Sequence, residues 1–119
     1  MELTFSAAAK PGIVSEPVKR RHRLVRRIDQ QIGFCAAIRT GDMPRASWAW
    51  VDDSGGYNTA IKYGRQPIEL KKGMFSIDCK DIDGLEQALM AVKAMVLKGD
   101  FDDQLAKAAA VIRARFGGG

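Results

Sequence analysis

Residues 48–63 read WAWVDDSGGYNTAIKY, in which apolar and polar side chains alternate on both sides of a glycine-containing turn. An alternation with a period of two is typical of β-strands, because successive side chains point to opposite faces of a sheet. The glycine pair Gly55-Gly56 supplies the positive φ angles that a tight turn requires. We therefore expect a β-hairpin here. The predicted cross-strand pairs are Trp50 with Ile61 and Trp48 with Tyr63.

Two shorter segments of the same kind follow the hairpin, at residues 68–70 and 75–79. A turn formed by Lys71, Lys72 and Gly73 separates them. Pro67 indicates an edge or an irregular start for the first segment. Together with the hairpin, these segments predict a four-stranded antiparallel meander.

A helix is predicted before the sheet, over residues 16–38. Ser15 is a suitable N-cap, and Glu16 and Pro17 are favourable in a first turn, where the backbone amides lack helical partners. Apolar residues then recur at steps of four, four and three, which is the spacing of one helix face. This stripe consists of Leu24, Ile28, Ile32 and Cys35.

Two more helices are predicted after the sheet, over residues 84–98 and 101–115. Asp83 and Glu86 are spaced as a capping box, and Gly99 is a natural C-cap. The apolar stripes are Leu85, Leu89, Val92 and Val96 in the first helix and Leu105, Ala109, Ile112 and Phe116 in the second. We expect an α+β fold in which the N-terminal basic helix precedes the sheet and the two C-terminal helices pack on it. Residues 1–14 are expected to form a flexible arm and residues 15–119 a single domain.

The composition is that of one globular domain. Hydrophobic residues make up 46% and charged residues 28% of the 119 residues, which suffices for one core and argues against disorder. The sequence has no apolar run long enough to span a membrane and no start typical of a secretory signal. Cys35 and Cys79 are therefore expected to be reduced thiols. These features predict a cytoplasmic protein without membrane attachment.

Positive charge is concentrated in the N-terminal third of the chain. The net charge is +5, from 19 Lys and Arg against 14 Asp and Glu. Residues 1–45 hold nine of the basic and four of the acidic residues, and six of the basic ones lie between residues 19 and 27. Such a cluster attracts polyanions over roughly one Debye length, about 8 Å at physiological salt. It also suits docking to an acidic protein, and the charge pattern leaves both readings open.

Basic and aromatic residues interleave in a way that suits single-stranded nucleic acid. Arginine binds phosphate oxygens through two parallel hydrogen bonds, and flat rings stack on unpaired bases. The predicted phosphate contacts are Lys19, Arg20, Arg21, Arg23, Arg26 and Arg27, extended by Lys62, Arg65, Lys71 and Lys72, and the predicted stacking residues are Trp48 and Tyr63.

The aromatic side of the hairpin has a second interpretation as the core face of the sheet, with Trp50 and Ile61 buried beneath the helices. The exposed face would then lack bulky rings. It would consist of Ala49, Val51, Asn58, Ala60 and Lys62.

No catalytic or metal-binding signature is recognised in the sequence. His22 is the single histidine, and with the two distant cysteines it does not have the spacing of a zinc site. Gly55-Gly56 lacks the lysine and serine that would follow it in a phosphate-binding loop. We therefore expect a protein that is not an enzyme and that carries no cofactor and no metal.

Three segments carry a resemblance to known proteins: residues 48–57 (WAWVDDSGGY), 61–65 (IKYGR) and 68–70 (IEL). They resemble an uncharacterised family of short phage and prophage proteins that combine a basic N-terminal helix, a tryptophan-containing strand and a C-terminal helical region. The resemblance covers residues 10–115 and implies a phage origin without an established activity. More loosely, the predicted meander followed by a helix is similar to the transcriptional-coactivator and Whirly-type single-stranded-DNA-binding folds, which are homo-oligomers.

These observations together predict a small nucleic-acid-binding protein of phage origin that acts in the host-cell cytoplasm and prefers single-stranded DNA or RNA. A homodimer is expected, because the meander leaves strand edges and the C-terminal helices carry a wide apolar stripe. The alternative is a protein-interaction module that binds and modulates a host enzyme through its basic helix. The partner would then be an acidic host protein.

Overall fold

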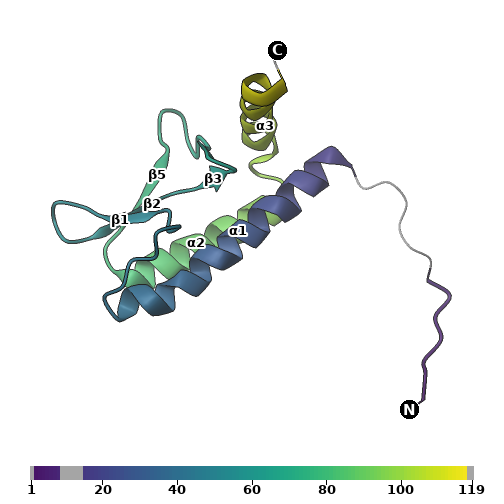
Figure 1. Cartoon of the computed structure of the whole chain (residues 1–119), viewed down its shortest axis with the longest axis horizontal. Helices are drawn as coiled ribbons and strands as arrows, with labels where there is room; N and C mark the ends of the chain where they lie inside the picture. The colour runs from purple at the N-terminus through teal and green to yellow at the C-terminus, as the bar shows by residue number, and fades with distance from the viewer. Residues whose placement is uncertain (1, 9–14, 118–119) are drawn as a thin grey trace.

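The computed structural model describes residues 2–8 and 15–117, with side chains to residue 115. Within these residues the chain forms three helices and antiparallel strands in two small sheets, which confirms the predicted α+β class (Figure 1). The elements in chain order are α1 (Glu16–Arg39), β1 (Ala49–Val51), β2 (Tyr57–Ala60), β3 (Lys62–Tyr63), β4 (Gln66–Pro67), β5 (Ser76–Cys79), α2 (Ile82–Lys98) and α3 (Asp102–Gly117).

The predicted arm, residues 1–14, is described only over residues 2–8, which are exposed and without regular structure. The remainder of the predicted arm, residue 1 and residues 9–14, lies outside the described residues. The same is true of the Phe116 side chain, which was predicted to extend the last apolar stripe.

Helices α1 and α2 lie side by side and antiparallel (Figure 1), and their buried apolar residues form one core with those of the strands. Leu24 and Ile28 of α1 and Leu85, Leu89 and Val96 of α2 are all 2% exposed or less. The predicted stripe of α2 is buried at all four of its positions. Ile32 of α1 was predicted to belong to the core, but it lies at the margin and is partly buried. The core is therefore formed chiefly between the two long helices and the strands.

Charged pairs fix the ends of this helix pair. Arg39, in the last turn of α1, donates hydrogen bonds of 2.8 Å to Asp83 and to Glu86 in the first turns of α2. The predicted capping box is therefore wrong, because its two acidic side chains bind Arg39. The N-cap of α2 is Asp81, whose carboxylate accepts from the Gly84 amide at 2.7 Å. The hydrogen bonds that Arg39 donates to Asp83 and to Glu86 raise its pKa.

The larger sheet has the order β1-β2-β5, and its register differs from the predicted one. Trp50 pairs with Asn58, three positions from the predicted partner Ile61. Because side chains alternate along a strand, a shift by an odd number of residues moves a side chain to the other face. Trp50 therefore lies on the outer face and is 44% exposed, so the prediction that it is buried is wrong. Ile61 is fully buried as predicted.

The Asp52 carboxylate explains this register. It accepts hydrogen bonds from the Ser54 amide and hydroxyl at 3.0 and 2.7 Å, from the Gly56 amide at 2.9 Å and from Asn58 Nδ2 at 3.0 Å. These donors, the Ser54 hydroxyl foremost, hold the pKa of Asp52 below its usual range. The loop closes between Asp52 and Gly56, whose backbone groups bond at 2.8 Å. The connection is thus longer than the two-residue turn that the glycine pair predicts.

The single four-stranded meander is also wrong. The chain leaves the larger sheet at Ile61 and forms a second, two-stranded sheet, β3-β4, through the turn at Gly64. Residues 68–70 form no strand, and Lys71 and Met74 make an isolated bridge instead. Strand β5 then returns to pair with β2. Helix α3 packs against β3-β4 and against α1, whereas α2 packs against β2 and β5.

The junction between α2 and α3 gives the first prediction. Gly99 caps α2 at φ 88°, and a Cβ there would lie 2.7 Å from Nη2 of Arg21. That guanidinium is held by Asp102, so it cannot easily move away. We expect Gly99→Ala to lower the free energy of unfolding by about 2 kcal/mol, from left-handed backbone strain of roughly 1–2 kcal/mol and the displaced ion pair. Urea unfolding followed by circular dichroism measures this value.

Two other glycines separate the effect of the left-handed backbone from the effect of the contact with Arg21. Gly73 has φ 74° with open space around it, so Gly73→Ala should show the strain alone. Gly33 lies in α1 with open space around it and without a positive φ. Gly33→Ala should therefore raise the free energy of unfolding by roughly 0.5–1 kcal/mol. Equal losses for Gly99→Ala and Gly73→Ala would show that the contact with Arg21 contributes nothing.

Candidate nucleic-acid interface

One face of α1 carries a row of arginines. Arg20, Arg23 and Arg27 are spaced by three and four residues, and Gln30 follows after three more, so all four lie along one side of the helix. The apolar residues Leu24 and Ile28 lie on the neighbouring face and are fully buried. Burial of the apolar stripe therefore fixes the direction in which this row projects, toward the side of the molecule that carries β3-β4.

The row borders a hollow of about 840 Å³, which we name the basic groove. Its walls are one side of α1, the loop that follows α1, and β3 with its turn. The lining residues are Arg27, Gln30, Gln31, Arg45, Ala46, Ser47, Trp48, Lys62, Gly64 and Arg65. Three of the predicted phosphate contacts and one predicted stacking residue thus lie together, although they come from three separate parts of the chain.

Gln31 holds the loop wall of the groove in place. Its side chain is buried, with 4% of the residue exposed. Nε2 donates to the Ala46 carbonyl at 3.0 Å, and Oε1 accepts from the Trp48 amide at 2.8 Å. The amide thereby satisfies two backbone groups of the loop as a neighbouring strand would. This pair of hydrogen bonds fixes Trp48 beside α1.

The groove is lined by four cations, Arg27, Arg45, Lys62 and Arg65, and by no carboxylate. Within residues 2–8 and 15–117, none of the four forms an ion pair with an acidic side chain. Arg27 instead donates to Gln30 Oε1 at 3.4 Å. Uncompensated like charges around one hollow produce a concentrated positive potential. The basic groove is therefore a region of concentrated positive charge.

The two predicted stacking residues differ in accessibility. Trp48 lines the groove and is half-buried, with part of its ring packed against the core. Tyr63 is 5% exposed, and the Arg23 guanidinium lies 5.9 Å from the centre of its ring and donates to its hydroxyl at 3.4 Å. The prediction that Tyr63 stacks on a base is wrong, because core packing and Arg23 cover the ring.

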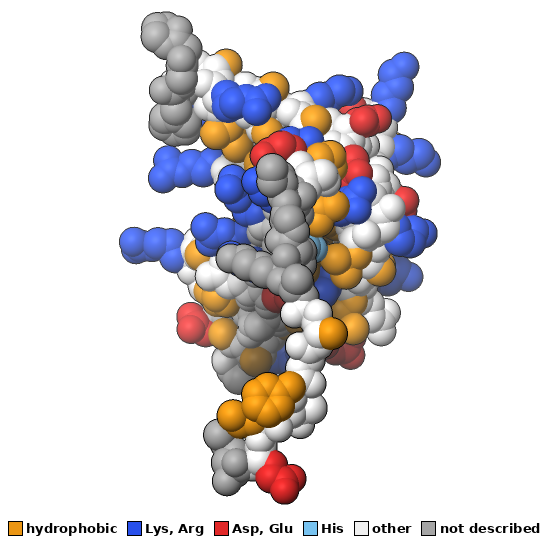
Figure 2. All heavy atoms as spheres, turned by 90° about the vertical axis from the view of Figure 1, so that its right-hand side faces the viewer, with side chains coloured by type: hydrophobic (Ala, Val, Ile, Leu, Met, Phe, Trp, Pro, Cys, Tyr) orange, Lys and Arg blue, Asp and Glu red, His pale blue; other side chains and the backbone are white. Residues whose placement is uncertain are grey.

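A second, smaller hollow lies one helical turn away, toward the N-terminal end of α1. It has a volume of about 260 Å³, and we name it the arginine pocket. Helix α3 supplies one wall, through Ala109, Ile112 and Arg113, and α1 supplies the other. The remaining lining residues are Glu16, Lys19, Arg20, Arg23 and Tyr63. On the side of the molecule where α1 begins, Lys and Arg side chains project over much of the surface (Figure 2).

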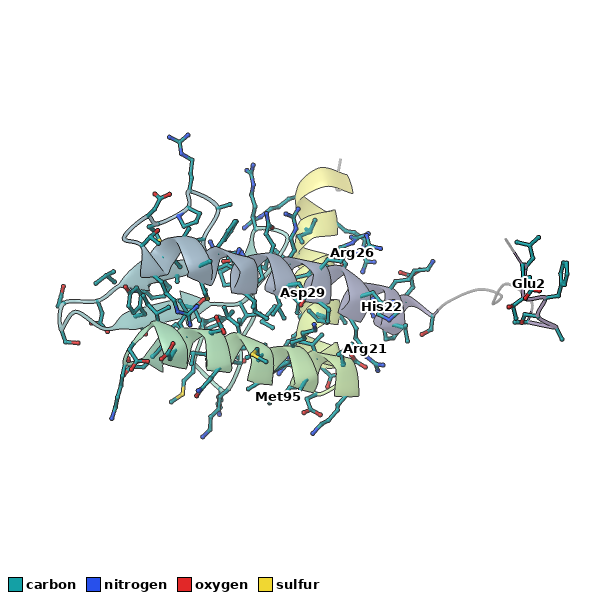
Figure 3. The ribbon with its side chains drawn as sticks, turned by 90° about the horizontal axis from the view of Figure 1, so that it is seen from below. Glu2, Arg21, His22, Arg26, Asp29 and Met95 are labelled. Atoms are coloured by element: carbon teal, nitrogen blue, oxygen red, sulfur yellow. The ribbon has the colours of Figure 1, made fainter. Side chains whose placement is uncertain are left out.

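The other predicted cations lie elsewhere. Arg21 pairs with Asp102 of α3, with Nε donating to Oδ1 at 2.9 Å, and this bond holds the pKa of Asp102 below its usual range. Arg26 belongs to the side of α1 that is seen in Figure 3, with His22 and Asp29. Lys71 and Lys72 lie in the exposed turn before β5 and line neither hollow.

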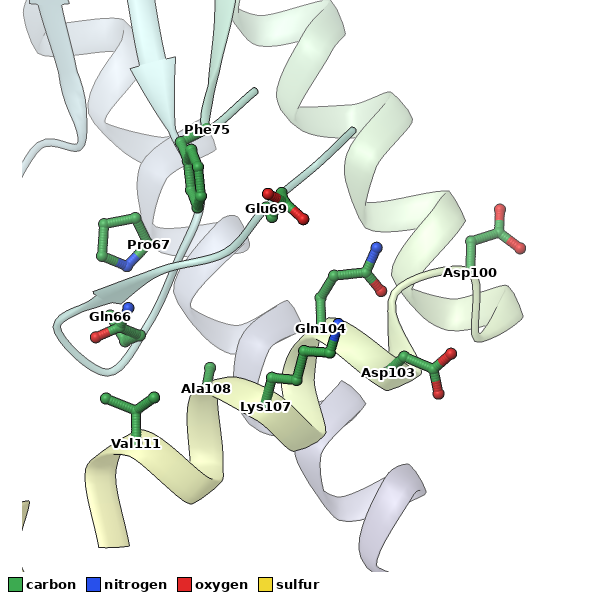
Figure 4. A pocket seen from close by; sticks show the side chains of 10 residues that line it. All are labelled: Gln66, Pro67, Glu69, Phe75, Asp100, Asp103, Gln104, Lys107, Ala108 and Val111. Carbon is green, nitrogen blue, oxygen red and sulfur yellow. The ribbon is translucent and has the colours of Figure 1, made fainter. Parts of the chain in front are cut away.

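Acidic residues gather on another side of α3. Glu69, Asp100 and Asp103 surround a hollow of about 440 Å³ that Lys107 and Phe75 also line (Figure 4). The acidic side chains in this lining outnumber its one cation, so its charge is opposite in sign to that of the basic groove and the arginine pocket. Within the described part of the chain, no three His, Cys, Asp or Glu side chains are grouped to hold a metal ion.

Sequence reasoning missed three residues of these sites. Arg45 and Arg113 lie outside the basic run, and Gln31 is polar within a helix. The signal for Gln31 is its place beside the apolar stripe, three residues after Ile28 and four before Cys35, where a polar side chain must find buried partners. The positions of the two arginines depend on tertiary packing, which no local pattern reveals.

Comparison with protein-family models, with curated proteins and with solved structures finds no match for this chain. Both resemblances therefore stay predictions, as does the homodimer. Within the described residues, no helix is long and apolar enough to cross a membrane.

Proposed function

We propose that this protein binds single-stranded nucleic acid in the basic groove. The observation that carries the proposal is the convergence of Arg27, Arg45, Lys62 and Arg65 on one hollow beside Trp48, without an acidic partner among the described residues. The proposal assigns binding and no chemical step.

The charges of the groove support a phosphate backbone as the ligand. Guanidinium groups donate two parallel hydrogen bonds to phosphate oxygens, and each neutralised phosphate releases condensed counterions. The row on α1 continues from the groove to the arginine pocket through Arg23 and Arg20. At 1.5 Å per residue, positions 20–30 extend over about 15 Å of helix, which is long enough for several consecutive phosphates.

Trp48 favours a single strand over a duplex. It lies in the groove wall between the cations, and stacking on an unpaired base is worth roughly 1–3 kcal/mol. The bases of a duplex are already stacked, so they present no free face to this ring. A groove that combines cations with a ring therefore discriminates by strand number rather than by sequence.

Binding is tested with a fluorescent oligonucleotide, as a single strand and as a duplex, by anisotropy at several salt concentrations. We expect tighter binding of the single strand and a log–log slope with salt near −0.7 for each phosphate neutralised. DNA and RNA of the same sequence are compared in parallel. Absence of binding at low salt to every oligonucleotide would end the nucleic-acid proposal, and the basic face would then be assigned to an acidic protein partner.

The contribution of stacking gives the second prediction. Trp48→Ala should weaken single-strand binding by about 5-fold to 150-fold, which corresponds to the loss of one stacked base, and should leave the salt slope unchanged. Duplex binding should change less. Because the ring also packs on the core, binding is measured below the unfolding temperature, and Trp48→Phe should restore most of the affinity.

Trp50 is the matched control for this variant. It is exposed on the outer face of β1 and does not line the groove, so Trp50→Ala should bind as the wild type does. In the Trp50→Phe background, the fluorescence of Trp48 should be quenched by a single strand. Equal losses for Trp48→Ala and Trp50→Ala would contradict the assigned position of stacking.

A further inference from the structure

The arginine pocket has a composition that its place in the fold does not explain. Arg20 and Arg23 of α1 and Arg113 of α3 line one hollow of about 260 Å³, although like charges repel. None of the three forms an ion pair with an acidic side chain within the described residues. The Tyr63 hydroxyl adds a neutral polar group at the floor, beside Arg23.

One donor of the Arg20 side chain lacks an acceptor. Nε of Arg20 is covered from solvent but makes no hydrogen bond within the described residues. A buried donor without a partner is costly, by about 1–3 kcal/mol, and more when the group is charged. Because this atom is covered, any contact of Arg20 with a ligand in the hollow falls to its other guanidinium nitrogens.

The rest of the pocket is compatible with an anion. The pocket lies against the first turns of α1, a helix of 24 residues whose N-terminus carries a partial positive charge. Glu16 is the one carboxylate in the lining, and it lies 3.4 Å from Lys19 with most of its side chain exposed. The pocket therefore keeps an excess of positive charge after this pair is counted.

We propose that the arginine pocket binds a phosphomonoester dianion, and that in the complex this group is the terminal phosphate of the bound strand. Binding of a phosphomonoester in the pocket is argued from the pocket alone, whereas its assignment to a strand end rests on the proposed function. A terminal phosphate carries about one charge more than a phosphate inside the chain and offers three free oxygens to the guanidinium groups. The pocket lies where the row on α1 begins, so a strand bound along this row with its end at α1's first turns would place its terminal phosphate there.

Inorganic phosphate tests the pocket without any nucleic acid. At equal ionic strength, 10 mM phosphate in place of chloride should raise the melting temperature of the wild type by about 4 °C, for millimolar affinity. Arg113→Gln should lose this increase. Arg113 is exposed, so the variant should fold normally. The matched control is Arg115→Gln, an exposed cation on α3 that does not line the pocket. No increase in the wild type, or the same increase in Arg113→Gln, would overturn the phosphate site.

Oligonucleotides with a 5′-phosphate, with a 3′-phosphate or with neither test the source of the phosphate. One terminal phosphate should strengthen binding about tenfold in the wild type and in Arg115→Gln, and should have no effect in Arg113→Gln. Phosphate stabilisation without a gain from either terminal phosphate would overturn the assignment to a strand end and indicate a free phosphate. Phosphate stabilisation through Arg113 with no oligonucleotide binding at all would refute the proposed function while supporting the pocket.

Discussion

Replacing Leu89 with Ala should lower the free energy of unfolding by about 2–5 kcal/mol, the largest effect on stability that we expect from one substitution in this chain. Leu89 is 2% exposed and lies in the middle of the buried stripe of α2. Removing its branched end leaves a cavity between the helices and the sheet that the neighbouring side chains fill only in part. Urea unfolding followed by circular dichroism measures the loss as a lower midpoint at an unchanged slope.

The next residue in the chain is the matched control. Met90 is 56% exposed on the same helix, so Met90→Ala should change stability by less than about 0.5 kcal/mol. Ile112→Ala should fall between the two, because Ile112 is partly buried where α3 packs beside the turn at Gly64. Losses below about 0.5 kcal/mol for both Leu89→Ala and Ile112→Ala would show that the C-terminal helices do not pack on the strands.

The helices were predictable because their information is local. In α2 the spacing of Leu85, Leu89, Val92 and Val96 specifies one face, and all four are buried. Gly99 ends the helix in the left-handed conformation that its position predicts. The buried face and the end of a helix depend on residues within one or two turns, so both can be predicted from a single sequence.

The sheet was predicted less well because its register depends on one side chain. The glycine pair indicates a turn, but the length of the turn follows from the four hydrogen bonds that the Asp52 carboxylate accepts. The resulting shift by three residues moved Trp50 from the predicted core face to the outer face. When the predicted register is wrong by an odd number of residues, every side chain of the strand is expected on the wrong face of the sheet.

The sequence predicted which types of residue form the candidate site, but not which of them lie together. The basic run indicated a positive surface, yet the helical geometry of α1 directs its side chains to different sides of the helix. Arg27 lines the basic groove, Arg20 and Arg23 line the arginine pocket, and Arg21 is held by Asp102. Arg45 and Arg113 complete the two hollows from distant parts of the chain, so only the tertiary structure brings them in.

Reversing two charges of the basic groove gives the largest effect on binding that we expect. Arg27→Glu with Arg65→Glu should weaken single-strand binding by at least about 100-fold at low salt, because each lost charge-assisted hydrogen bond contributes about 1.5–3 kcal/mol. Both side chains are exposed, and neither pairs with an acidic side chain within the described residues, so the fold should be retained. Anisotropy at 50 and 200 mM salt should also show a shallower slope, since fewer counterions are released.

The same change in net charge can be made away from the groove, with Arg26→Glu and Lys72→Glu. Arg26 lies on the side of α1 shown in Figure 3, and Lys72 lies in the turn before β5. If binding depends on the local geometry of the groove, this variant should lose no more than about fivefold, because neither side chain lines the groove and both charges are exposed to solvent and screened by salt. Equal losses for the two double variants would mean that net charge alone attracts the nucleic acid, and the basic groove would then have no specific role.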